Sequence, residues 1–309
     1  MLDPAFKAML DTINAIELPP LKMIPPDFLR QNYRDTRVGL DTGAPQDLDV
    51  KNLEIPGPAG AIKARLYAPK GAASPGAGIV YFHGGGFVIG DLDTHDSFLR
   101  RLSASSGVRV LAVDYRLAPE HPFPAAHDDA LAATRWAFDH AADIGFDPKK
   151  VAVGGDSAGG NLAAAISLEM RDDPQRKLAF QLLLYPATAM DMETQSRKDL
   201  GEGHLLTAEV MQWFGDHFGV SGHPQQHRAE PAHMVDVSGA PTALVVTAGY
   251  DPLKDEGKAY AEKLSKAGVQ ATHIEYPGFV HDFYILGHIN PKVFDVIDET
   301  AEALKNGLA

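Results

Sequence analysis

Short apolar segments rich in β-branched residues recur along this chain, and helical patterns separate several of them. Their apolar residues do not alternate with polar ones, which is typical of strands buried on both faces. These segments span residues 78–82, 108–113, 151–153, 179–184 and 242–247. Between two of them, residues 130–138 carry apolar side chains at helical spacing. Strands that alternate with helices in this way indicate a mostly parallel sheet covered by helices on both faces.

The N-terminal part of the chain lies outside this alternation. Asp3 and Pro4 have the pattern of an N-cap followed by a first-turn proline, and apolar residues then recur on one face as far as Ile16. Because this predicted amphipathic helix carries only one Lys before Glu17, we expect it to pack on the protein and not on a lipid surface. Residues 19–47 are rich in proline and polar residues without a sustained period, and we interpret them as a covering segment.

Two further intervals interrupt the pattern. Residues 48–55 and 61–67 are β-like runs separated by a Pro-Gly-Pro turn signal at 56–58, which predicts an antiparallel pair at the start of the sheet. The long interval 185–241 has no strand pattern, but a helical stripe follows Thr207, which is a candidate N-cap. An insertion of this kind after a strand can form a lid over a site.

Composition excludes several classes of function. The chain has 28 Lys and Arg against 41 Asp and Glu, a net charge of −13, and its densest basic group, Arg100, Arg101 and Arg109, is too short for a phosphate-binding stripe. No apolar run reaches the roughly 18 residues of a membrane span. The first residues lack the basic and apolar regions of a signal peptide. We therefore expect a cytoplasmic protein without a nucleic-acid partner or stable membrane association. The absence of Cys excludes disulfides, thiolate chemistry and Cys-ligated zinc.

A G-x-S-x-G motif from Gly155 to Gly159 lies directly after one of the predicted strands and before an Ala-rich helical run. A nucleophilic serine has to project from a sharp strand-to-helix turn in which only very small neighbours fit. The glycines and Ala158 meet this steric demand around Ser157. The alternative interpretation is a glycine-rich turn in which Ser157 caps the helix.

A second glycine-rich motif, H-G-G-G-F, begins at His83 and follows another predicted strand. The tetrahedral intermediate of a serine nucleophile needs hydrogen-bond donors directed at the developing oxyanion. We predict that the backbone N–H groups of Gly84, Gly85 and Ala158 form this oxyanion hole and that His83 orders the loop. A phosphate-binding loop is disfavoured, because Asp91 stands where such a motif requires Lys.

With these motifs the sequence resembles the hormone-sensitive-lipase-like family of α/β-hydrolases, the family IV carboxylesterases. Besides H-G-G-G-F, the resemblance is carried by D-Y-R-L-A-P-E at 114–120, F-P-A-A at 123–126 and G-D-S-A-G-G at 155–160. It implies an α/β-hydrolase fold, in which a mostly parallel sheet of about eight strands has helices on both faces and a helical cap. It also implies four parts: an N-terminal part of the cap (1–45), the first part of the core (46–187), a cap insertion (188–228) and the second part of the core (229–309).

The resemblance further implies the acid and the base of a catalytic triad. The family's acid lies in a D-P-L segment after the seventh strand, here Asp251, and its base lies in the loop after the eighth strand, here His281. The chain order of Ser, Asp and His is the order found in α/β-hydrolases. From the residues alone, Asp251 could equally cap a helix that starts at Pro252.

Neighbouring titratable residues offer weaker alternatives. Asp255 and Glu256 lie one helical turn further on, and we interpret them as solvated or supporting positions. His273 lies within a predicted strand, and His288 lies further along the chain. Asp282 stands where the family usually has Gly. Its charge either raises the basicity of the catalytic histidine or points to water, and we favour the surface position.

A cluster of histidines raises the hypothesis of a metal site. Its members are His217, His223, His227 and His233. Gly222 and Pro224 argue against a regular helix there, and no carboxylate completes a zinc motif. We expect packed or solvated histidines, and we expect neither a metal nor an organic cofactor.

Together these features predict a carboxylesterase that acts on short to medium acyl esters. Ser157 attacks the ester carbonyl and forms an acyl-enzyme, His281 is the base, and Asp251 orients it. The alternatives are an amidase or peptidase with the same triad, and a non-catalytic small-molecule receptor on the same fold. Such receptors lack the catalytic His, which is present here. The resemblance also implies a possible homodimer through the last predicted strand, residues 270–276.

Overall fold

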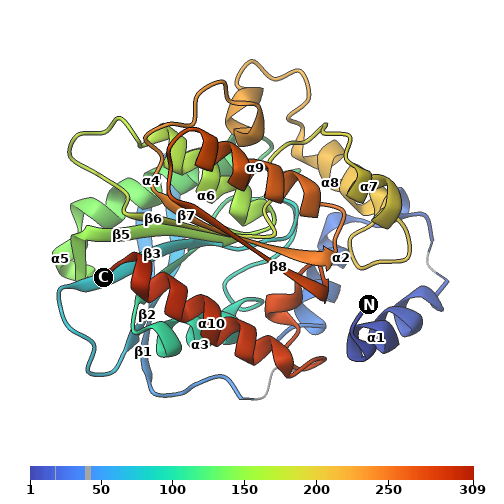
Figure 1. Ribbon diagram of the computed structural model, residues 1–309, viewed down its shortest axis with the longest axis horizontal. Coiled ribbons are helices and arrows are strands. Elements are labelled where there is room, and N and C mark those ends of the chain that lie inside the picture. Colours follow the sequence, from blue (N-terminus) through green and yellow to red (C-terminus); the bar gives the residue numbers. More distant parts are fainter. Residues whose placement is uncertain (18, 39–42) are drawn as a thin grey trace.

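The computed structural model describes residues 1–17, 19–38 and 43–309, and within them eight strands form one sheet (Figure 1). The strands are β1 (Leu48–Gly57), β2 (Gly60–Pro69), β3 (Gly76–Phe82), β4 (Arg109–Asp114), β5 (Phe146–Asp156), β6 (Phe180–Leu184), β7 (Thr242–Tyr250) and β8 (Ala271–Val280). Their order across the sheet is β1-β2-β4-β3-β5-β6-β7-β8. β2 is antiparallel to both β1 and β4, and all other neighbours are parallel. The predicted parallel sheet with an antiparallel opening pair is confirmed.

Helices cover both faces of this sheet (Figure 1). The helices are α1 (Pro4–Asn14), α2 (Pro26–Asp35), α3 (Asp96–Ser106), α4 (Ala125–Asp139), α5 (Ala141–Ile144), α6 (Ala158–Glu169), α7 (Gln195–Leu200), α8 (Ala208–Phe218), α9 (Lys254–Lys266) and α10 (Lys292–Gly307). Helices α4, α6 and α9 share one hydrophobic core with one face of the sheet. Helices α3 and α10 share a second core with the other face.

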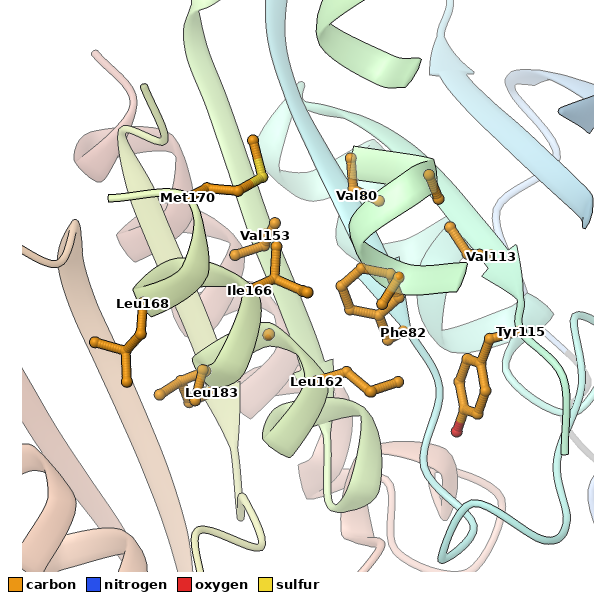
Figure 2. Close-up of a cluster of buried hydrophobic side chains, with 14 of the residues drawn as sticks. Val80, Phe82, Val113, Tyr115, Val153, Leu162, Ile166, Leu168, Met170 and Leu183 are labelled. Atoms are coloured by element: carbon orange, nitrogen blue, oxygen red, sulfur yellow. The ribbon is translucent and has the colours of Figure 1, made fainter. Parts of the chain in front are cut away.

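Helix α6 lies at the centre of the first core. Every residue from Ala158 to Leu168 is buried, because sheet, helices and loops surround this helix on all sides. Its side chains Leu162 and Ile166 face Phe82 of β3 and Val153 of β5 (Figure 2). This packing anchors the start of α6 firmly against the strands that precede the two glycine-rich motifs.

Helices α1, α2, α7 and α8 lie together at the right of Figure 1, beyond the ends of β7 and β8. Two hydrogen bonds join the N-terminal segment to the long insertion: Asn14 Nδ2 donates to the Gly203 carbonyl at 2.9 Å, and the Leu21 N–H donates to Glu209 Oε1 at 3.1 Å. Residues 18 and 39–42, which belong to the predicted N-terminal part of the cap, lie outside the described residues. None of the helices in the described ranges has the length and hydropathy needed to cross a bilayer.

Helix α2 was not expected from the sequence, which showed no period over residues 19–47. Tyr33 is its only buried residue, and Phe28 and Leu29 are its only other large apolar side chains, so polar residues dominate its sequence. Tertiary contacts hold it instead: the Arg30 guanidinium donates to the carbonyls of Val88 and Ala118, both at 2.8 Å, and pairs with Glu120.

Strand β8 extends beyond its predicted end at residue 276. It continues through Pro277 as far as Val280, with a register shift against β7 around Gly249. A Cβ at Gly249 would lie 2.3 Å from the Pro277 carbonyl oxygen, so only glycine permits the two strands to approach here. As a result the strand delivers His281 directly at its carboxyl end.

Candidate active site

Ser157 is the single residue between the end of β5 and the start of α6. Its backbone has φ 52° and ψ −116°, a conformation that residues other than glycine rarely adopt. A Cβ on Gly159 would lie 1.9 Å from the Phe82 carbonyl oxygen, and one on Gly155 would lie 2.3 Å from the Gly159 carbonyl. The Ser157 side chain makes no capping hydrogen bond to α6. The alternative interpretation of a capping serine is therefore wrong.

His281 lies within hydrogen-bond distance of both Ser157 and Asp251. His281 Nε2 is 2.9 Å from Ser157 Oγ, and His281 Nδ1 is 2.7 Å from Asp251 Oδ2. All three are buried. Because a carboxylate can only accept a hydrogen bond, Nδ1 carries the imidazole proton and Nε2 accepts from the serine hydroxyl. The three residues predicted from distant parts of the chain thus meet at one point.

The sheet explains this convergence. Asp251 directly follows β7 and His281 directly follows β8, and these parallel neighbours end at the same edge as β5. Asp251 does not cap the helix that follows it, because Leu253 occupies the N-cap position. Its Oδ1 accepts the Leu253 N–H at 2.8 Å, while its Oδ2 faces the histidine. The helix itself begins at Lys254, two residues later than Pro252.

The surroundings of His281 favour its positive form. Burial lowers the pKa of the imidazole, but the charge and hydrogen bond of Asp251 outweigh it, and Asp282 and Asp156 add to this effect. The net effect of burial and of these carboxylates is that the pKa of His281 is raised to about 9. A base with a raised pKa accepts the serine proton readily, and it has to be neutral to do so.

The glycine loop after β3 corrects one prediction. The Gly84 N–H donates to Asp156 Oδ1 at 3.0 Å, so it is not available to an oxyanion, and Gly84 does not line the cavity at Ser157. Gly85, Gly86 and Ala158 do line that cavity, and their N–H groups donate to no acceptor within the described part of the chain. Gly86 is therefore the better candidate for the role assigned to Gly84.

A cavity of about 650 Å³ opens beside Ser157 and His281. Apolar side chains line most of it, including Met9 of α1, Phe28 of α2 and Phe214 of α8. Phe28 is 61% exposed, so the apolar lining continues to the opening of the cavity. An apolar cavity with a few polar groups at one end is typical of a site for a small hydrophobic molecule.

Comparison with known proteins agrees with this geometry. A family model described as alpha/beta hydrolase fold matches residues 79–285. The chain belongs to the hormone-sensitive-lipase-like family of α/β-hydrolases. It is 40% identical over 291 residues to the carboxylic ester hydrolase LipN of Mycobacterium tuberculosis, covering 91% of this chain and 77% of that protein. It is 34% identical over 327 residues to an ethyl acetate hydrolase of Pseudomonas putida, covering 99% of each.

Solved structures of esterases are also similar to this chain. An ester hydrolase from the metagenome of Lake Arreo, solved with a bipyridine phosphonate derivative, superimposes with a TM-score of 0.94 at 40% identity and 99% coverage of both chains. A hyperthermophilic esterase from Pyrobaculum calidifontis gives a TM-score of 0.91 at 38% identity, covering 99% of this chain and 98% of that one.

Asp156 lies in the site of this protein, and the sequence analysis did not identify it. It is 1% exposed, and its Oδ1 accepts hydrogen bonds from the Tyr81 hydroxyl at 2.8 Å and from the Gly84 N–H at 3.0 Å. Its Oδ2 is 3.3 Å from His95 Nε2. Burial opposes ionisation, but His95 and Tyr81 together lower the pKa of Asp156. A carboxylate at the end of a buried strand needs hydrogen-bonding partners, so the position of Asp156 directly after the apolar run of β5 could have marked it in the sequence as a functional residue.

His83 has the loop-ordering position that was predicted for it. Its Nδ1 is 2.7 Å from the Gly84 carbonyl oxygen, and its ring stacks on Tyr115, whose hydroxyl donates to the His83 carbonyl at 2.7 Å. Burial, with the neighbouring charge of His95, lowers the pKa of His83 to about 4. The neutral imidazole therefore fills the space beneath the glycine loop.

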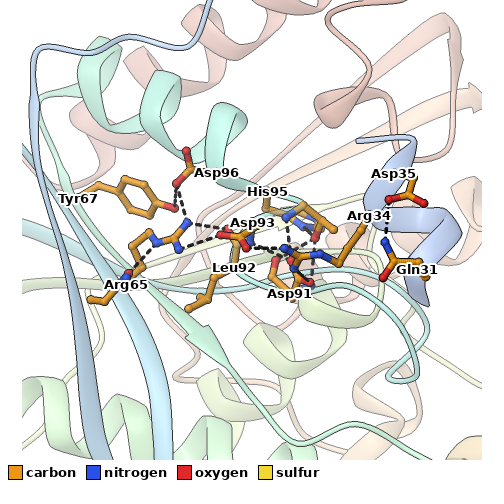
Figure 3. Close-up of polar contacts among 12 residues, drawn as sticks. Gln31, Arg34, Asp35, Arg65, Tyr67, Asp91, Leu92, Asp93, His95 and Asp96 are labelled. Carbon is orange, nitrogen blue, oxygen red and sulfur yellow. Dashed lines mark hydrogen bonds and ion pairs between the residues drawn. The ribbon is translucent and has the colours of Figure 1, made fainter. Parts of the chain in front are cut away.

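A charged network fixes the segment that carries His95 (Figure 3). Arg65 of β2 pairs with Asp93 and Asp96, both at 2.8 Å. Arg34 of α2 contacts Asp91 and pairs with Asp93 at 2.7 Å. The network thus ties the N-terminal helix α2 to the loop that follows the glycine motif.

The surface position favoured for Asp282 is wrong. Its side chain is 14% exposed and lines the cavity, and Oδ2 accepts a hydrogen bond from the Tyr33 hydroxyl at 3.3 Å. Arg37 Nη2 lies 3.9 Å from the same oxygen. Tyr33 lies in helix α2, which the sequence did not reveal, and Arg37 lies in the turn directly after that helix.

The solvated interpretation is also wrong for Glu256, which is fully buried. Its carboxylate accepts from the Thr188 N–H at 2.8 Å and from Arg197 Nη2 at 2.6 Å. Burial raises the pKa of Glu256 to about 7 against the opposing charge of Arg197. Asp255 Oδ2 accepts from the Ser196 N–H at 2.8 Å. Both acids thus support the junction between α9 and helix α7 of the insertion.

The remaining histidines occupy separate positions. His273 Nε2 is 2.9 Å from Thr247 Oγ1, away from Ser157, whereas His288 lines the cavity. His217 packs on Trp213, and His223 on Phe123. Among the described residues, only one of the four clustered histidines, His233, belongs to a group that could hold a metal ion. Its other members are Asp191 and Glu230.

Proposed function

We propose that this chain is a carboxylesterase that hydrolyses short to medium acyl esters through an acyl-enzyme on Ser157. The observation that carries the proposal is the hydrogen-bonded series from Ser157 Oγ through His281 to Asp251 at the bottom of an apolar cavity. The names of the relatives support ester substrates: one is a carboxylic ester hydrolase and another an ethyl acetate hydrolase.

Acylation begins when Ser157 Oγ attacks the ester carbonyl carbon and its proton passes to His281 Nε2. Asp251 holds the imidazole by its Nδ1–H and stabilises the imidazolium. The oxyanion accepts from the N–H groups of Gly85, Gly86 and Ala158, each worth about 3 kcal/mol in the transition state. His281 then donates the proton to the leaving alkoxide, and the alcohol departs. The acyl group remains on Ser157.

Deacylation repeats these steps with water as the nucleophile. His281 takes a proton from water, the hydroxide attacks the acyl carbon, and the same donors hold the second oxyanion. The imidazolium returns the proton to Ser157 Oγ as the carboxylic acid leaves. The cycle consumes one ester and one water and needs neither a metal nor an organic cofactor.

Residues 1–45 and 188–228 form the cap in this proposal, and residues 46–187 and 229–309 form the core. The cap supports the preference for short to medium chains, because its helices α1, α2 and α8 line the cavity at about 650 Å³. p-Nitrophenyl esters from acetate to palmitate test this point. We expect kcat/KM to peak at or below about eight acyl carbons and to fall for longer chains.

The decisive experiment replaces the nucleophile. Ser157→Ala should lower kcat for p-nitrophenyl butyrate by at least about 10⁴-fold while the folded state is retained. An organophosphate should label the wild-type protein on Ser157 with loss of activity. Ser238→Ala is the matched control, because Ser238 is an exposed serine away from the cavity. A Ser157→Ala variant with more than a tenth of wild-type activity would refute the proposal.

Two further expectations belong to this proposal. β8 is the last strand of the sheet and pairs only with β7 among the described strands, so a second copy could extend the sheet into a homodimer. Sedimentation velocity should then give a dimer, and a monomer at all concentrations would remove this expectation. A cytoplasmic location, without a nucleic-acid partner, stays a prediction that cell fractionation can test.

A further inference from the structure

Asp282 has an unusual conformation next to the proposed base. Its φ of 63° and ψ of 8° lie in the left-handed region, which favours glycine and which Asp and Asn tolerate better than most residues. Its Oδ1 lies 3.8 Å from His281 Nε2. Nε2 is the nitrogen that faces Ser157, so Asp282 lies on the opposite side of the imidazole from Asp251.

Helix α2 and the turn directly after it hold this carboxylate in place. Tyr33 donates its hydroxyl hydrogen to Asp282 Oδ2, and Arg37 Nη2 lies 3.9 Å from that oxygen. The Arg37 guanidinium also lies 4.8 Å above the Tyr33 ring, so the two partners support each other. All three residues line the cavity. Their position gives the N-terminal segment a direct connection to the reacting end of His281.

We propose that Asp282 is a positioning residue that ties helix α2 to the catalytic loop and holds a second negative charge beside the Nε2 side of His281. This inference rests on the proposed function. At 3.8 Å the carboxylate is too far to take the Nε2 proton, so that proton remains directed to Ser157 or to the leaving group. Its charge stabilises the imidazolium that forms during acylation.

Several charged or titratable groups of the described residues surround the imidazole. These are Asp251, Asp282, Asp156, Tyr185, Tyr33 and Arg37. Asp251 acts on the Nδ1 side, and Asp282 acts on the Nε2 side. Arg37 is the cation that partly offsets Asp282. Removing the charge of Asp282 should therefore lower the pKa of His281, and removing the charge of Arg37 should raise it.

The test is the pH dependence of kcat/KM for p-nitrophenyl butyrate. Asp282→Asn removes the charge but keeps an acceptor for Tyr33, and Asn tolerates the left-handed conformation. We expect the acid limb of the profile to move to lower pH by about one unit and kcat on the plateau to fall about 3- to 10-fold. Asp282→Gly relieves any backbone strain and should move the limb in the same direction.

Two controls separate electrostatics from general effects. Arg37→Gln should move the acid limb to higher pH, because it leaves the Asp282 charge without its cation. Asp35→Asn removes an exposed carboxylate from the same helix α2 and should leave the profile unchanged.

The proposal is overturned if Asp282→Asn does not move the limb to lower pH. It is also overturned if Arg37→Gln moves the limb in the same direction as Asp282→Asn, or if Asp35→Asn shifts it equally. Ser157→Ala in the same assay separates the two proposals. If Ser157→Ala is inactive and the acid limb of Asp282→Asn has not moved, only the role of Asp282 is refuted. If Ser157→Ala is active, the proposed function is refuted as well.

Discussion

Replacing Asp156 by Ala removes the carboxylate that holds the glycine loop against the nucleophile turn. The change deprives three groups of their acceptor: the Tyr81 hydroxyl, the Gly84 N–H and His95 Nε2. Asp156 is 1% exposed, so bulk water does not replace the lost bonds directly. The perturbation is therefore a test of how much this one side chain contributes to the site.

The magnitude follows from the number of unpaired groups. A buried donor without an acceptor costs about 1–3 kcal/mol. With three such groups and some relaxation, we expect Asp156→Ala to lower the free energy of unfolding by about 3–6 kcal/mol. Releasing the Gly84 N–H also frees the loop that carries the proposed oxyanion donors. A displacement of about 1 Å there should lower kcat by about 100-fold, with a smaller change in KM.

Asp156→Asn is the matched control. The amide oxygen can still accept from Tyr81 and Gly84, and the amide nitrogen can donate to a neutral His95 whose Nδ1–H turns to Thr94 Oγ1, 2.9 Å away. We expect this variant to lose about 1–2 kcal/mol, mainly through the lost charge, and to keep kcat within about fivefold of wild type.

Urea unfolding followed by the fluorescence of the two Trp residues measures stability, and p-nitrophenyl butyrate hydrolysis measures kcat and KM. The reasoning fails if Asp156→Ala lies within about 1 kcal/mol of wild type with kcat within threefold. It also fails if Ala and Asn are indistinguishable, because the difference between them is the set of hydrogen bonds.

Three other predictions follow from the structure. kcat/KM should rise with pH through an apparent pKa above 6.5 and towards 9, because His281 must be neutral to act and its pKa is raised, and a profile already flat at pH 6 would contradict this. Gly159→Ala should lower kcat by at least 100-fold, because its Cβ would lie 1.9 Å from the Phe82 carbonyl oxygen and needs about 1.5 Å more; wild-type kinetics would show that the turn can relax. Glu256→Ala should lower the free energy of unfolding in urea by about 3 kcal/mol, because Arg197 keeps only the Ala189 and Met190 carbonyls as acceptors and the Thr188 N–H loses its acceptor; a loss below about 1 kcal/mol would argue against this role of Glu256.

Much of the fold could be predicted from local patterns. Each strand of the sheet, and the core helices α4, α6 and α9, lie close to where the apolar runs and helical patterns indicate them, because these patterns reflect burial of neighbouring residues in the chain. Helices α3 and α10 were not predicted. The glycines around Ser157 also carry a local steric signal. Parallel strands then bring Asp251 and His281 to the edge at which Ser157 lies.

Helix α2 is an element that local sequence patterns did not predict. Its few apolar residues stand among many polar ones, and Arg30 and Arg34 hold it by binding groups of distant loops. Neighbours in the chain carry no information about such partners. The helix then decides the environment of Asp282, so one missed element also made the interpretation of that residue wrong.

The sequence by itself determined the succession of strands along the chain, several of the helices between them, the turn that presents Ser157 and the chain positions of the proposed base and acid. Only the tertiary structure decided that the Gly84 N–H serves Asp156, 72 residues away, and that Asp282 meets Tyr33, 249 residues away. The physical reason is that burial periodicity is written into consecutive residues. A hydrogen bond between distant segments depends instead on how the finished elements pack, and each donor can serve only the acceptor that this packing places within reach.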